Sequence, residues 1–106
     1  MDVFNIQDFK GGWFIGNFNP SIFKNPFFEV AHHHHTAGTV GKPHTHKVAE
    51  EVTYIVKGSL NASGIVLGPG DMFIYHPNEI ADVVFLQDTD LIVIKWPSVP
   101  NDKYDV

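Results

Sequence analysis

The chain has 106 residues, seven basic and twelve acidic, and its formal net charge is −5 with histidine neutral, which argues against nucleic acid or an anionic membrane as partner. Cysteine is absent, which excludes disulfide bonds and thiol chemistry, and 43% hydrophobic residues suffice for one core, so we expect a single domain over residues 1–106. No apolar run reaches about 18 residues, and the opening MDVFNIQDFK lacks the pattern of a secretion signal, so we expect a soluble cytoplasmic protein.

Short segments rich in Val, Ile, Phe, Thr and Tyr follow one another and predict β-structure almost throughout. The expected strands are residues 13–18, 27–35, 51–57, 72–75, 82–86 and 91–96, separated by Pro- and Gly-containing turns. Residues 21–24 could form one helical turn, but no segment keeps a helical period. Many short strands at this spacing predict an all-β, antiparallel sandwich or barrel. The tail PSVPNDKYDV is expected to cross the barrel, or a neighbouring subunit, as an extended segment.

The segment from Gly38 to Gly58 is the most informative part of the chain. His44 and His46 are two residues apart, so a strand would direct both imidazoles to one face, and Glu51 follows five residues later. Neutral imidazole nitrogen and carboxylate oxygen together suit divalent Fe, Mn, Ni, Co or Zn. The sequence therefore predicts a divalent metal ion held by these three side chains.

This segment resembles the first motif of the cupin superfamily, G-x5-H-x-H-x3–4-E-x6-G. Gly38, His44, His46, Glu51 and Gly58 match it without a gap. The resemblance implies a cupin-type antiparallel β-barrel, or jelly roll, with the metal inside.

The second cupin motif, G-x5-P-x-G-x2-H-x3-N, is degenerate in this chain. If Gly70 and Pro77 are aligned with one inserted residue, Asp82 falls where the motif has a third histidine. Without the insertion that position is Ala81, which cannot bind a metal. We prefer the alignment through Pro77, because proline restricts the backbone and marks the turn before the next strand. Asp82 could then be a ligand, a group behind the ligands, or a surface residue.

Residues 32–35 are four consecutive histidines inside an expected strand, where their side chains would alternate between the two faces. If the apolar side chains of Phe28 and Val30 face the interior, His32 and His34 face it too. One of these two could then supply the imidazole that is missing at position 82. Alternatively the histidines are polar residues of an exposed or subunit-facing strand, and a bulge near Gly38 could reverse the alternation.

Three longer stretches, GGWFIGNFNPS, PHTHKVAEEVTYIVKGS and IKWPSVPNDKY, resemble a group of small single-domain cupins without an assigned reaction. The resemblance implies a homodimer paired through an edge strand. Two functions stay open at this point. One is a metalloenzyme acting on a small oxygen-rich or carbonyl compound by dioxygenase, isomerase or lyase chemistry. The other is a non-catalytic module that binds a small molecule or a metal.

Overall fold

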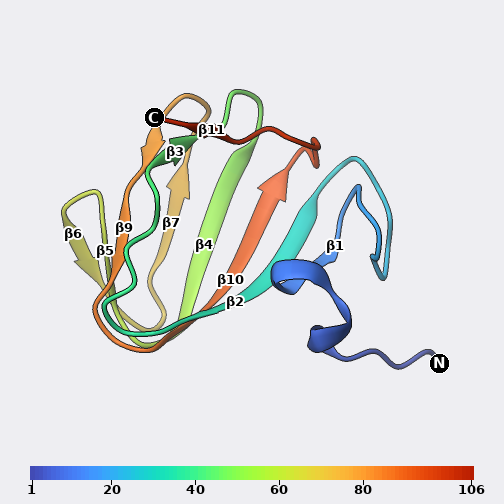
Figure 1. Ribbon diagram of the computed structural model, residues 1–106, viewed down its shortest axis with the longest axis horizontal. Helices are drawn as coiled ribbons and strands as arrows, with labels where there is room; N and C mark the ends of the chain where they lie inside the picture. The colour runs from blue at the N-terminus through green and yellow to red at the C-terminus, as the bar shows by residue number, and fades with distance from the viewer.

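The computed structural model describes residues 1–106, which form eleven short strands and two single turns of 3-10 helix (Figure 1). The turns are η1 (Ile6–Asp8) and η2 (Lys10–Gly12). The strands are β1 (Trp13–Ile15), β2 (Glu29–His35), β3 (His44–Thr45), β4 (Glu50–Lys57), β5 (Leu60–Ala62), β6 (Ile65–Leu67), β7 (Met72–Tyr75), β8 (Ile80–Ala81), β9 (Val83–Phe85), β10 (Thr89–Trp96) and β11 (Tyr104–Asp105). The chain has no helix that is long and apolar enough to cross a membrane.

The strands form three antiparallel sheets. The largest has the order β1-β2-β10-β4-β7, and two smaller ones have the orders β11-β3-β8 and β6-β5-β9. In Figure 1 the small sheets lie opposite the large one, so that together they enclose a barrel interior. The expected all-β, antiparallel barrel is confirmed.

Most expected strands are present, with ends shifted by a few residues. The helical turn expected at residues 21–24 is wrong, because Phe23 forms an isolated bridge to Ile15. The hairpin of β5 and β6 was missed because each strand has only three residues, joined by a turn in which Ser63 and Gly64 have positive φ. The tail crosses the barrel as expected, and its last part pairs with β3.

The barrel interior changes character along β10. Thr89, Leu91 and Val93 are buried on the inner face and lie beside a core cluster of seven residues: Ala31, Ile55, Leu60, Ala62, Phe85, Leu91 and Val93. Lys95 follows on the same face and is also buried. One end of the barrel is therefore a conventional apolar core, and the other end carries charge inside.

Candidate metal centre and cavity

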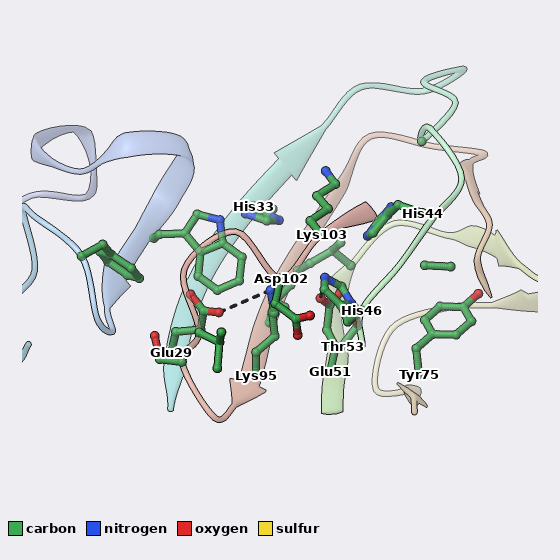
Figure 2. Close-up of a pocket in the computed structure, with 18 of the residues that line it drawn as sticks. Glu29, His33, His44, His46, Glu51, Thr53, Tyr75, Lys95, Asp102 and Lys103 are labelled. Carbon is green, nitrogen blue, oxygen red and sulfur yellow. Dashed lines mark ion pairs between the residues drawn. The ribbon is translucent and has the colours of Figure 1, made fainter. Parts of the chain in front are cut away.

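A cavity of about 600 Å³ lies inside the barrel (Figure 2). Its walls come from the turn η2, from strands of all three sheets, and from residues 98–103 of the C-terminal segment. The core residues Phe85, Leu91 and Val93 form part of its apolar lining. A volume of this size accommodates a small organic molecule.

The three side chains of the first motif all line this cavity. His44 lies on β3, His46 directly follows that strand, and Glu51 lies on β4. The two imidazole rings are nearly perpendicular with centroids 5.2 Å apart, and Nε2 of His46 lies 3.7 Å from Oε2 of Glu51. The structure therefore brings together the three residues that the sequence grouped.

The electrostatics of these groups keep the imidazoles available as ligands. Burial, together with the positive charges of Lys95 and His44, lowers the pKa of His46 to about 4. Burial likewise raises the pKa of Glu51, against an opposing effect of Lys95. Nδ1 of His44 lies 3.0 Å from the carbonyl oxygen of Lys42. Since a carbonyl only accepts, Nδ1 carries the proton and Nε2 is left free to bind a metal.

The donor set fits a divalent metal in type, and partly in position. Two ligands of a tetrahedral ion, each about 2.0–2.1 Å from it, lie roughly 3.3 Å apart, which is close to the 3.7 Å between His46 and Glu51. No group of three His, Cys, Asp or Glu side chains is arranged closely enough to hold an ion as it stands.

A charged row crosses the inner face of the large sheet next to these ligands. Lys95 on β10 is paired in register with Glu29 on β2 and with Glu51 on β4, and Glu51 is paired with Tyr75 on β7. All four side chains line the cavity. Nζ of Lys95 lies 3.3 Å from Oε1 of Glu29, and both side chains are only 11% exposed. Burial raises the pKa of Glu29, and Lys95 opposes that rise.

Asp102, in the C-terminal segment, is the site residue that sequence analysis missed. Its carboxylate accepts hydrogen bonds from the backbone N–H groups of Lys47, Val48 and Ala49 at 2.9–3.3 Å, and the residue is 3% exposed. Burial by itself would raise the pKa of Asp102, but these three N–H donors outweigh it and lower the pKa. The bonded loop connects His46 to Glu51, so Asp102 fixes the spacing of two candidate ligands.

No family model matches the sequence, and no curated protein matches it. Many solved structures do match the fold. KdgF from Halomonas sp. is 26% identical, with a TM-score of 0.68 over 73% of this chain and 74% of that one. An uncharacterised protein with a double-stranded β-helix domain from Klebsiella pneumoniae is 16% identical, with a TM-score of 0.66 over 91% of this chain and 84% of that one.

The DMSP lyase DddQ from Ruegeria pomeroyi is 20% identical, with a TM-score of 0.67 over 84% of this chain and 46% of that one. Together with the motif of His44, His46 and Glu51, these structural matches decide the fold. The chain has the cupin fold. The fold expected from the first motif is confirmed.

In this cupin the position of the second-motif histidine is not filled by Asp82. Asp82 is exposed and does not line the cavity, whereas Ala81 on β8 is 7% exposed, lines it and pairs with His44. The alignment through Pro77 therefore placed the wrong residue inward. Alternation along the chain turns Asp82 outward, where its N–H lies 3.4 Å from the Tyr75 hydroxyl.

The expected orientation of the histidine run is also wrong. His32 and His34 lie on the outer face of β2, where Nδ1 of His34 is 2.7 Å and Nε2 of His32 is 4.0 Å from Asp90. The inner positions of this strand begin at Glu29 and continue to His33 and His35, which line the cavity. His35 stacks on Phe85 with ring centroids 4.1 Å apart. Two β2 imidazoles therefore do line the cavity, but they belong to His33 and His35 and not to His32 and His34.

Proposed function

We propose that this cupin is a metal-dependent enzyme of the lyase or isomerase type that acts on a small oxygen-rich or carbonyl compound. The observation that carries the proposal is the meeting, in one cavity, of His44, His46 and Glu51 with the buried pair of Lys95 and Glu29. The two imidazoles and the Glu51 carboxylate are suitable ligands for a divalent metal, and the pair of Lys95 and Glu29 could donate and accept protons.

His44, His46 and Glu51 would hold the ion, two through neutral nitrogen and one through carboxylate oxygen. When bound, the metal would polarise a carbonyl or hydroxyl oxygen of the substrate. The cavity, with a volume of about 600 Å³, limits the substrate to a small molecule.

Lys95 and Glu29 supply the acid and base in this proposal. Their side chains are nearly buried and lie 3.3 Å apart: the Glu29 carboxylate would take a proton from carbon and become neutral, and the Lys95 ammonium group would donate a proton to the substrate oxygen and become neutral in turn. Burial raises the pKa of Glu29, which brings a carboxylate closer to the range in which it acts as a base near neutral pH. This favours proton abstraction next to a carbonyl over dioxygen chemistry.

Enzymes of the same fold support a catalytic assignment. They include the DMSP lyase named above, a nucleoside dehydratase, Pac13, and an oxalate decarboxylase, each of which breaks a bond in a small oxygen-containing compound. These activities belong to those proteins. Their relevance to this chain is that the same barrel hosts lyase chemistry in several of them.

Metal analysis of untagged protein tests the metal part of the proposal. After exposure to Fe(II), Mn(II), Ni(II) and Zn(II) and removal of free ions, we expect about one ion per chain by mass spectrometry of the elements. The His46→Ala variant should lose it, because the remaining donors are too few. His34→Ala is the matched control, since His34 lies on the outer face and should leave the cavity metal unchanged. Wild-type protein that takes up no metal would refute the metalloenzyme.

Exchange of substrate protons tests the acid–base part. Metal-loaded protein incubated in D₂O with small hydroxy and keto compounds should introduce deuterium next to the carbonyl, as followed by ¹H NMR. Glu29→Gln should slow the exchange at least tenfold, since it removes the base while keeping the shape. Equal exchange rates in the two proteins would remove Glu29 from the proposal.

A second candidate function is a binding module without catalysis. The observation that favours it is that no three metal-binding side chains meet at one point as the structure stands. Tight binding of a small molecule with no turnover and no dependence on His46 would support this candidate instead.

A further inference from the structure

The lysines of this chain are concentrated around the cavity. The chain has seven basic residues, all of them lysine, and a net charge of −5. Four of these lysines line the cavity, namely Lys10, Lys42, Lys95 and Lys103, against three carboxylates from Glu29, Glu51 and Asp102. More than half of the lysines of a negatively charged protein therefore line one cavity, and an anion would be attracted to those without a carboxylate partner.

Two of the four lysines have no carboxylate partner. Lys42 is 2.9 Å from Asp105 and Lys95 is 3.3 Å from Glu29, so both are already paired. Lys10 and Lys103 take part in none of the ion pairs, which extend to 4.0 Å. Their ammonium groups are free to bind an incoming ligand.

The carboxylates of the cavity do not compete for these two lysines. Glu29 is held by Lys95, and Asp102 is held by three backbone N–H groups. Glu51 faces His46, 3.7 Å away. Two of the three cavity carboxylates are therefore already bound by other groups, whereas Lys10 and Lys103 are not.

The backbone of Lys103 is fixed on both sides. Asp102, directly before it, is anchored to the loop of residues 47–49, and β11, directly after it, pairs with β3. Figure 2 shows Lys103 between His33 and His44, beside Asp102. Because its point of attachment is held, less conformational entropy is lost when the side chain binds a ligand.

Neutral hydrogen-bonding groups accompany the two lysines. Asn17, Asn19, Ser98 and Asn101 also line the cavity, and the Ser98 hydroxyl ties the two segments together by accepting from the N–H of Asn17 at 2.8 Å. Amides and hydroxyls of this kind bind the hydroxyl or carbonyl oxygens of a ligand.

We propose that the substrate carries a carboxylate, which Lys103 and Lys10 bind, and that hydroxyl or carbonyl groups fill the rest of the cavity. This proposal rests on the proposed function, because it names the substrate class of the same cavity. A carboxylate is favoured over a phosphate because neither of the helical turns exceeds three residues, so the chain offers no long helix N-terminus as a phosphate cradle.

Paired ligands test this proposal directly. 2-Oxoglutarate, D-gluconate and citrate would each be titrated beside a neutral counterpart: dimethyl 2-oxoglutarate, D-gluconamide and trimethyl citrate. Binding would be followed by protein ¹H–¹⁵N NMR shifts at an ionic strength of about 0.15 M. We expect at least one carboxylate to bind at least tenfold more tightly than its neutral counterpart. Equal affinities within every pair, or no binding of any carboxylate at its highest soluble concentration, would overturn the proposal.

Lysine variants locate the effect. Lys103→Met and Lys10→Met should each weaken the carboxylate about three- to tenfold and leave the neutral counterpart unchanged, because they keep the apolar stem and remove only the charge. Lys24→Met is the matched control, since Lys24 is exposed, does not line the cavity and should not change affinity. Unchanged affinity in both cavity variants would overturn the assignment of these lysines.

The titrations would be made on chelator-treated and on metal-supplemented protein, which separates this proposal from the metalloenzyme proposal. Carboxylate binding that depends on Lys103 in a protein that takes up no metal would support the substrate class and refute the metalloenzyme. Metal uptake that depends on His46, with equal affinity for carboxylates and their neutral counterparts, would support the metalloenzyme and overturn the carboxylate proposal.

Discussion

The inner and outer faces of the large sheet have opposite character at the cavity end of the barrel. On the inner face one row across four strands reads Glu29, Lys95, Glu51 and Tyr75. The next row, on the outer face, reads Val30, Ile94, Val52 and Ile74. An antiparallel sheet with one wet face normally places apolar residues inward and polar residues outward. Here the order is reversed.

The reversal is local. One row further along the inner face, Ala31, Val93 and Thr53 are buried and lead into the apolar core. On the outer face the apolar surface continues over Tyr54 and Met72, which are 40% and 65% exposed. The inner charges lie where the proposed substrate would bind, and the outer apolar residues form a surface that association with another molecule would cover.

Lys95→Met should have the largest effect, because it tests whether the inner charges stabilise one another. Removing the ammonium group would leave Glu29 buried without its partner, and we expect a loss of about 3–5 kcal/mol in the free energy of unfolding. Urea denaturation at neutral pH measures it. The double variant Glu29→Met with Lys95→Met should regain most of this loss, since it removes both charges. If Lys95→Met is as stable as wild type, the pair is solvated and the inner face of the sheet does not bury charge.

Asp102→Ala should have the next largest effect. It removes the acceptor of the N–H groups of Lys47, Val48 and Ala49, and we expect a loss of about 2–3 kcal/mol in unfolding free energy together with weaker metal binding. Asp105→Ala is the control on the same segment, since Asp105 forms an exposed pair with Lys42 and should change little. Equal metal affinity in the two variants would limit Asp102 to a structural role.

Acidification should separate the inner from the outer histidines of β2. Burial, reinforced by the nearby charge of His35, lowers the pKa of His33 to about 4 from an ordinary 6.5. Between these values the unfolded chain binds a proton that the folded one does not, so this residue makes stability fall as pH drops from 6.5 to 4. His33→Gln should flatten the dependence of unfolding free energy on pH in this window. An unchanged slope would place His33 in solvent.

The outer face should matter for assembly more than for stability. The homodimer remains a prediction, and the sequence favoured an edge strand as its contact. Ile94→Lys, in the middle of the outer apolar surface, should yield monomers by light scattering if this face pairs instead. Ile65→Lys on the edge strand β6 is the matched variant, since Ile65 is 63% exposed. Dissociation by Ile65→Lys alone would favour the edge strand.

The motif of His44, His46 and Glu51 could be recognised because its spacing is local and its residue types are rare in combination. The orientation of the histidine run could not, for a reason that follows from the reversed sheet. We expected Val30 to face inward because it is apolar, and its parity carried His32 and His34 with it. In fact Val30 lies on the outer face and Glu29 on the inner one.

The sequence offered Ala81 only as the alternative alignment and gave no indication of Asp102, for different reasons. Ala81 depends on a single residue of register in a two-residue strand, where one shift exchanges inside and outside. Asp102 acts on backbone groups more than fifty positions earlier, and an isolated aspartate in a Pro-rich tail gives no sign of such a contact. Its hydrogen bonds became visible only in the folded chain.

Four histidines in sequence would, in a flexible tail, act as a short affinity tag. On β2 the strand divides them into two pairs that point to opposite sides, so an external nickel ion can reach only His32 and His34. One of these is already bound to Asp90 at 2.7 Å. Of these four histidines only the two on the outer face of β2 could therefore contribute to retention on a nickel column, and a purification designed around the sequence HHHH would overestimate that retention.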